Sequence, residues 1–139
     1  MMVFMRSFPV SIGPEEGRAL HDWVVREGAR RTIEVGLGWG VSALFICDAL
    51  AANGPDGRHV AIDAYQLAPL PQHRTRYDGA GLRALEEASV RDLVELHLEE
   101  SQVVLPRLLA ESRRFDLAFV DGNHRFEAVF LDLVYCGRL

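Results

Sequence analysis

The chain contains no lysine, because all 15 of its Lys+Arg residues are arginines. A protein without lysine cannot form a Schiff base, use a lysine as general base, or bind phosphate through a Walker-type lysine. The 20 acidic residues outweigh the arginines and give a formal net charge of −5. A nucleic-acid partner requires a basic face, so no nucleic acid is expected as a partner.

Cysteines and long apolar runs are also scarce. Cys47 and Cys136 both stand in apolar segments, which favours buried thiols over a disulfide or a metal pair. No apolar run approaches the roughly 20 residues of a membrane span, and residues 1–9 lack the apolar core of a signal peptide. These absences predict a cytoplasmic protein that does not enter a membrane.

A length of 139 residues supports one domain over 1–139, which is large enough to bury a core. Residues 1–13 have the character of a leader, and Pro14 suits the first position of a helix that ends near Gly28. We expect this helix to cover a cofactor cleft or a sheet edge. The N-terminal leader and helix then occupy 1–29, and the core of the domain occupies 30–139.

The core contains four successive strand and helix units with largely apolar strands. Such units predict a parallel sheet with helices on both faces, an α/β doubly wound fold of strand order 3-2-1-4. Pro106 lies inside one expected helix, where it would kink the helix or shift its start. The expected strands are 32–35, 59–63, 94–98 and 115–121. The expected core helices begin near Val41, Gly79, Ser101 and Arg125, and Ser101 is expected to cap its helix. The last helix is expected to pack on the sheet through Phe126, Val129, Phe130, Leu133 and Val134.

A glycine-rich turn joins the first strand to its helix, in the segment Thr32 to Ser42. Gly36, Gly38 and Gly40 allow positive φ and leave no Cβ between the turn and a ligand. The free N–H groups of the following helix favour negative charge at the same place. This arrangement indicates a nucleotide-type cofactor, although a glycine turn that binds nothing is the alternative. An NAD or nucleotide-sugar site is disfavoured because Val41 replaces the third glycine of the dinucleotide fingerprint.

A second acid follows the second strand. Asp63 lies 25 residues beyond Gly38, near where nucleotide-binding folds place a carboxylate that accepts ribose hydroxyls. Capping of the next turn is the alternative role. The segment Ala64–Tyr77 contains two prolines and reads as a loop beside the cofactor, with Tyr65 near the ribose or adenine.

The glycine turn resembles the first motif of the class I S-adenosylmethionine (SAM)-dependent methyltransferases, in which an acid such as Glu34 precedes the glycines. The segment Phe115–His124, with sequence FDLAFVDGNH, is similar to the fourth-strand signature of small-molecule O-methyltransferases of the catechol and macrocin type. The resemblance covers residues 30–139. It implies methyl transfer from SAM to a hydroxyl of a small molecule, and a cofactor site made of Glu34, Gly36, Gly38, Trp39, Gly40, Asp63, Ala64, Tyr65, Ser101, Gln102 and Asp121.

The same resemblance implies roles for two residues after the fourth strand. Asp121 corresponds to a ligand of a divalent metal such as Mg²⁺, or to an acid beside the site of methyl transfer. His124 stands where related enzymes carry a lysine general base, and a histidine suits proton transfer near neutral pH. Structural roles are the alternatives, namely an acid that orients the Gly122 turn and a histidine that binds a loop carbonyl.

The chain ends where the family continues into a fifth strand, so the resemblance implies an incomplete form of the seven-stranded methyltransferase fold. An apolar fourth strand at the edge of a sheet invites pairing with a second copy. We therefore expect a homodimer that buries this strand or the Arg125–Cys136 helix. A SAM-binding or degenerate module without turnover remains the alternative to an enzyme.

Overall fold

The computed structural model describes residues 11–69 and 76–139. Parts of the leader expected over 1–13 and of the loop expected over 64–77 therefore lie outside the described residues. The described chain forms a parallel sheet of order β3-β2-β1-β4, which confirms the strand order predicted from the sequence. The strands are β1 (Arg31–Val35), β2 (Arg58–Ile62), β3 (Val94–His97) and β4 (Leu117–Val120).

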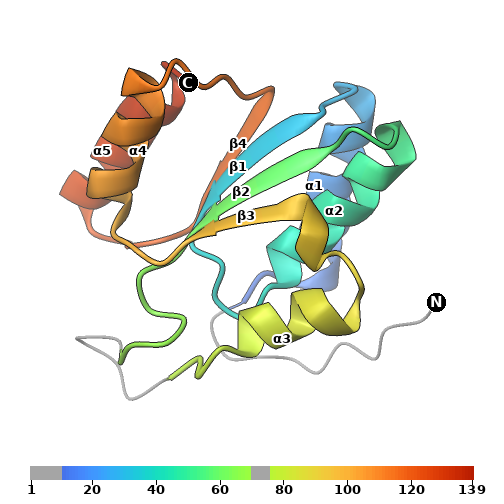
Figure 1. Cartoon of the computed structure of the whole chain (residues 1–139), viewed down its shortest axis with the longest axis horizontal. Coiled ribbons are helices and arrows are strands. Elements are labelled where there is room, and N and C mark those ends of the chain that lie inside the picture. The colour runs from blue at the N-terminus through green and yellow to red at the C-terminus, as the bar shows by residue number, and fades with distance from the viewer. Residues whose placement is uncertain (1–10, 70–75) are drawn as a thin grey trace.

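Helices cover both faces of this sheet (Figure 1). On β1, Ile33 and Val35 face one helical layer, and the alternate residues Thr32 and Glu34 face the other. A short 3₁₀ turn, Arg91–Leu93, leads into β3. The first layer contains α4 (Ser101–Ala110) and α5 (Phe126–Cys136), and the second contains α1 (Pro14–Arg26), α2 (Val41–Asn53) and α3 (Ala80–Glu87).

The first helix begins where the sequence predicted. Pro14 is the first residue of α1, as expected, and the Gly13 N–H donates to Glu16 Oε2 at 2.7 Å. The helix α1 packs beside α2 and against Leu117 of β4, so it lies over one face of the sheet at its β4 side. No helix of the described residues has the length and apolar content that a membrane span requires.

In α4 the prediction that Ser101 caps the helix is wrong. Glu100 occupies the cap position, Ser101 is the first helical residue, and Pro106 lies inside the helix without shifting its start. The Ser101 hydroxyl instead faces the buried carboxyl group of Asp132 on α5, whose pKa burial raises. The serine therefore joins two helices, because its side chain faces α5 and not its own first turn.

The packing of α5 also differs from expectation. Its apolar residues were predicted to face the sheet, but the side chains of Phe126 and Phe130 are 81% and 56% exposed and stack on each other. Leu133 and Val134 are exposed as well. The helix contacts the core through Tyr135 and Cys136, while Asp132 is its buried residue. Helical periodicity identified an apolar face, but the described chain places no element against most of it.

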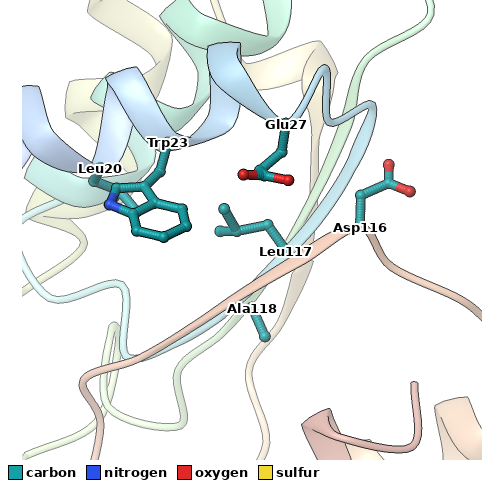
Figure 2. A pocket seen from close by; sticks show the side chains of 6 residues that line it. All are labelled: Leu20, Trp23, Glu27, Asp116, Leu117 and Ala118. Carbon is teal, nitrogen blue, oxygen red and sulfur yellow. The ribbon is translucent and has the colours of Figure 1, made fainter.

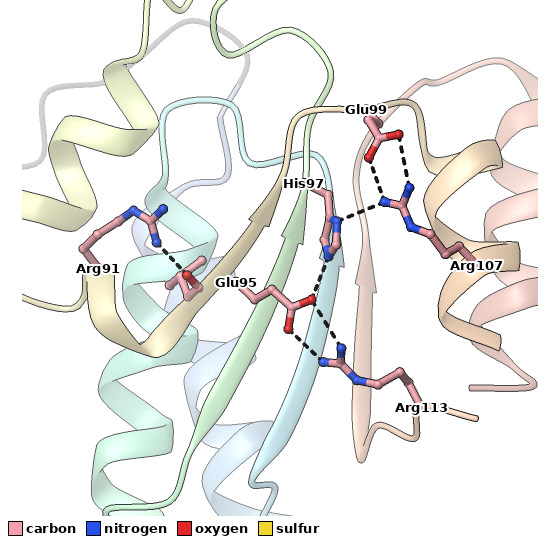
Figure 3. A network of polar contacts seen from close by, with 7 residues as sticks. Arg91, Glu95, His97, Glu99, Arg107 and Arg113 are labelled. Atoms are coloured by element: carbon pink, nitrogen blue, oxygen red, sulfur yellow. Dashed lines mark hydrogen bonds and ion pairs between the residues drawn. The ribbon is translucent and has the colours of Figure 1, made fainter. Parts of the chain in front are cut away.

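The two edges of the sheet differ in chemistry. Charged side chains lie along the β3 edge (Figure 3). Glu95 lies 2.9 Å from both Arg113 and His97, and Glu99 lies 2.7 Å from Arg107. The Arg113 hydrogen bond holds the pKa of Glu95 below its ordinary value. The β4 edge instead carries Leu-Ala-Phe-Val over Leu117–Val120. Charged side chains discourage edge pairing, so β4 is the edge open to a partner strand.

The glycine turn is fixed to the end of β4. Gly36 has φ 98°, its N–H donates to the Ile62 carbonyl at 2.8 Å, and the Asp121 N–H donates to the Val35 carbonyl at 2.9 Å. A Cβ on Gly36 would overlap the carbonyl group of Asp121. Gly38 also has positive φ, 51°, but a Cβ there would meet no atom closer than 3.6 Å. Close backbone approach therefore requires glycine at 36 more strictly than at 38.

We predict that Gly36→Ala lowers the free energy of unfolding by about 3–5 kcal/mol, because backbone strain and steric overlap add together. Gly38→Ala, the matched control, should cost only about 1–2 kcal/mol for its left-handed backbone. Urea unfolding followed by circular dichroism would measure both values. Equal losses in the two variants would contradict a special backbone contact at Gly36.

Candidate functional site

The carboxyl ends of β1, β2 and β4 bring together the glycine turn, Asp63 and Asp121, as the sequence predicted for a doubly wound sheet. The Asp63 carboxylate is almost fully buried. It accepts hydrogen bonds from the Gly38 N–H and from the Tyr65 N–H, both at 2.8 Å. Asp63 thus holds the glycine turn and caps its own turn, which was the alternative role considered for it.

Glu34 lies beneath the glycine turn in a buried polar cluster. Its Oε2 accepts a hydrogen bond from the Ser42 hydroxyl at 2.6 Å, and its Oε1 lies 3.1 Å from His59 Nε2. This second contact is an ion-pair distance and not an aligned hydrogen bond. His59 Nδ1 lies 2.9 Å from the Thr32 hydroxyl. Glu34 and His59 are fully buried, so Glu34 faces the protein interior and supports the turn from below.

Asp121 and His124 are neighbours on the turn after β4. His124 Nε2 lies 3.3 Å from Asp121 Oδ1, and the two side chains are 70% and 42% exposed, respectively. A carboxylate beside an imidazole can orient the ring and stabilise its protonated form. This pair can therefore accept a proton from a group that approaches the open side of the site.

The residues predicted to surround the adenosine lie between β2 and α4. The Tyr65 hydroxyl donates to Glu100 at 2.5 Å, and this hydrogen bond raises the pKa of Tyr65. Ser101 faces Asp132 on α5, and the side chain of Gln102 is exposed. The hydrogen bond between Tyr65 and Glu100 therefore joins the end of β2 to the start of α4, beside the predicted adenine pair.

Sequence reasoning missed two residues of this region. Gln66 is fully buried, and its amide donates to the Gly38 carbonyl at 2.7 Å and to Asp63 Oδ2 at 2.9 Å. Tyr77 places its ring beside Gly38 and packs edge-on against Trp39. Both residues belong to a segment without hydrophobic periodicity. The only signal in the sequence was that this segment follows β2 and Asp63, and that signal did not identify Gln66 or Tyr77.

No group of three or more His, Cys, Asp or Glu side chains that could hold a metal occurs within residues 11–69 and 76–139. The donor set around Asp121 consists of that carboxylate and His124. Mg²⁺ prefers several oxygen ligands in octahedral geometry, so the described residues alone do not fit a magnesium site. Cys47 and Cys136 are free thiols, and burial raises their pKa values to about 12 and about 11.

An open groove of about 490 Å³ lies away from this site, between α1 and the N-terminal end of β4 (Figure 2). Leu20 and Trp23 of α1 form one wall with Glu27, which follows the helix, and Asp116, Leu117 and Ala118 form the other. Asp116 Oδ2 accepts the N–H groups of Arg30 and Arg31, each at 2.8 Å, and these bonds lower the pKa of Asp116. The groove therefore belongs to the open β4 edge and not to the predicted cofactor site.

Comparison with known proteins identifies the family of the chain. Tricin synthase 2 of Oryza sativa subsp. japonica is 35% identical over 117 residues, which cover 82% of this chain and 36% of that protein. Caffeoyl-CoA O-methyltransferase of Populus kitakamiensis is 32% identical over 116 residues, which cover 82% of this chain and 44% of that protein. The chain thus spans less than half the length of these relatives.

A solved structure gives the same result for the fold. The O-methyltransferase TomG of Streptomyces achromogenes, determined in complex with SAM, superposes with a TM-score of 0.75 at 30% identity, covering 94% of this chain and 52% of TomG. The family model described as a methyltransferase domain matches residues 33–138. This chain therefore belongs to the methyltransferase-domain family, as its glycine turn and fourth-strand motif predicted.

Proposed function

We propose that this chain is the SAM-binding core of an enzyme that transfers a methyl group to a hydroxyl of a small molecule. The main support for this proposal is that the glycine turn, Asp63 and Asp121 lie together at the carboxyl ends of the strands. O-methyltransferases among the relatives, and the SAM complex of TomG, support both the cofactor and the hydroxyl acceptor. We also propose a single domain over 1–139 and a cytoplasmic location, with which two free thiols agree.

In this proposal the methionine part of SAM lies at Gly36–Gly40 and the ribose lies at Asp63. Two carboxylate oxygens offer about four acceptor positions, and three of those on Asp63 are already used by Gly38, Tyr65 and Gln66. One ribose hydroxyl can therefore bind without loss of the internal bonds. Trp39, Ala64, Tyr65, Ser101 and Gln102 are proposed to line the remaining cofactor surface, and Glu34 to support it from below.

We predict that Asp63→Ala weakens SAM binding by about 1.5–3 kcal/mol, the range for hydrogen bonds to a charged group. Calorimetry with SAM, S-adenosylhomocysteine and NAD would measure this loss and the choice of cofactor. Gln66→Met is the matched control, because it removes a bond to the same carboxylate from a side chain that is fully buried. Equal losses in the two variants would assign Asp63 a purely structural role, and a preference for NAD would contradict the proposal.

For the chemical step, SAM supplies an activated methyl group, and the protein must orient the acceptor and remove its proton. With the proton of its ring on Nε2, facing Asp121, His124 presents Nδ1 as the atom that takes the hydroxyl proton. Asp121 then stabilises the imidazolium ion. A metal such as Mg²⁺ at Asp121 would need ligands beyond those that the described residues provide, so no step is assigned to it.

We expect Asp121→Asn and His124→Gln each to lower kcat by about 10²- to 10⁴-fold, the usual contribution of acid–base catalysis. Their affinity for SAM should stay close to that of the unaltered chain, because their contacts are with the acceptor. The assay would follow S-adenosylhomocysteine formation with a panel of small phenols and sugars, including caffeoyl-CoA. Loss of SAM binding in both variants would show a folding role, and an unaltered chain without turnover would favour a binding module.

We propose further that two copies associate through the open edge of β4. A two-fold axis at this edge would pair β4 with its own copy in antiparallel orientation and bring the exposed faces of both α5 helices together. The contrast with the charged β3 edge supports β4 as the interface. Phe126 and Phe130 add exposed apolar side chains on α5, the helix that follows β4.

Light scattering at micromolar concentration should give the mass of a dimer. Phe130→Glu should convert it to a monomer, because the variant places a charge in the apolar interface. The matched control is Val103→Glu on α4, whose side chain is 51% exposed and lies outside the proposed interface. A monomeric unaltered chain, or equal effects of both variants, would contradict this interface.

A further inference from the structure

Tyr77 closes one side of the glycine turn. A Cβ built on Gly38 would lie 3.6 Å from the Tyr77 hydroxyl oxygen and from its ring carbon Cε1. The ring packs edge-on against Trp39, with centroids 5.4 Å apart and planes at 85°. The turn therefore presents an aromatic pair beside the N–H groups that would receive the cofactor.

The same ring stands near both acids of the site. Burial raises the pKa of Tyr77, and the carboxylates of Asp63 and then Asp121 raise it further. The hydroxyl therefore stays protonated and the side chain uncharged. A neutral, electron-rich ring among carboxylates is an environment that attracts a positive charge.

SAM carries such a charge at its sulfonium sulfur, which is bonded to the methionine side chain, the 5′ carbon of the ribose and the transferred methyl group. The proposed function places these three groups at the glycine turn, Asp63 and Asp121, respectively. Tyr77 lies beside the glycine turn, and the charges of Asp63 and Asp121 both act on its hydroxyl. Building on that proposed function, we infer that Tyr77 is a cofactor-binding residue whose ring packs against the sulfonium of SAM. Tyr77 thereby makes the site prefer the charged cofactor over its neutral product.

The test compares SAM with S-adenosylhomocysteine, which lacks the positive charge. Calorimetry on Tyr77→Leu should show SAM binding weakened by about 3- to 30-fold, the range for a cation over an aromatic ring, and product binding changed by less than about 2-fold. Tyr77→Phe keeps the ring and should retain the SAM preference of the unaltered chain. Tyr77→Gln keeps a polar group without a ring and should behave as Tyr77→Leu, which provides a second ringless variant if one folds poorly.

Equal weakening of both ligands in the ringless variants, or no weakening of either, would overturn the sulfonium contact. Loss of the preference in Tyr77→Phe would assign the effect to the hydroxyl and also overturn it. If the unaltered chain binds neither ligand, the proposed function fails and the inference fails with it. Binding by the unaltered chain with an unchanged ratio in the ringless variants defeats the inference alone.

Discussion

The backbone contact between Gly36 and Asp121 is the constraint on which the site depends. Gly36 sits at the end of β1, the strand at which the chain order reverses, and the carbonyl group of Asp121 occupies the space that a Cβ would need. The N–H groups of Gly36 and Asp121 complete this junction through the carbonyls of Ile62 and Val35. The first, second and fourth strands therefore end at one fixed point. A ligand bound there contacts three separate segments of the chain, which explains why a sheet of this order can place ribose, methionine and acceptor side by side.

Beneath that junction the protein buries a polar cluster where an apolar one would pack more simply. Taking a carboxylate out of water costs free energy unless polar contacts offset it, and Glu34 accepts a hydrogen bond from Ser42 and lies 3.1 Å from His59 Nε2. Ser42 lies in the first turn of α2, so the cluster fixes the start of that helix against β1. The cluster thus fixes the position of the helix N-terminus that borders the proposed cofactor site. The apolar face of the same strand, with Ile33 and Val35, supplies packing with α4.

Sequence reasoning predicted the parts of this structure that depend on local patterns. Apolar alternation and glycine spacing gave the four strand and helix units, the strand order and the meeting of Gly36, Asp63 and Asp121. It missed Gln66 and Tyr77 because their roles arise from contacts between segments, without a periodic pattern to mark them. It misplaced the cap of α4 because Ser101 and Glu100 are adjacent, and only the backbone geometry decides between them. It misjudged α5 because periodicity reveals an apolar face and not the element that covers it.

The exposed face of α5 and the open edge of β4 bear on catalysis as well as on assembly. The proposed cofactor side of the site is enclosed by β1, β2, α3 and the aromatic pair of Trp39 and Tyr77, all within the described chain. The proposed acceptor side is different, because Asp121 and His124 follow β4 directly and are largely exposed. Methyl transfer requires the acceptor to be held in line with the cofactor and shielded from water. A second copy at the β4 edge, as proposed above, would therefore also form a wall of the proposed acceptor site, so cofactor binding would be a property of one chain while turnover would depend on the pair.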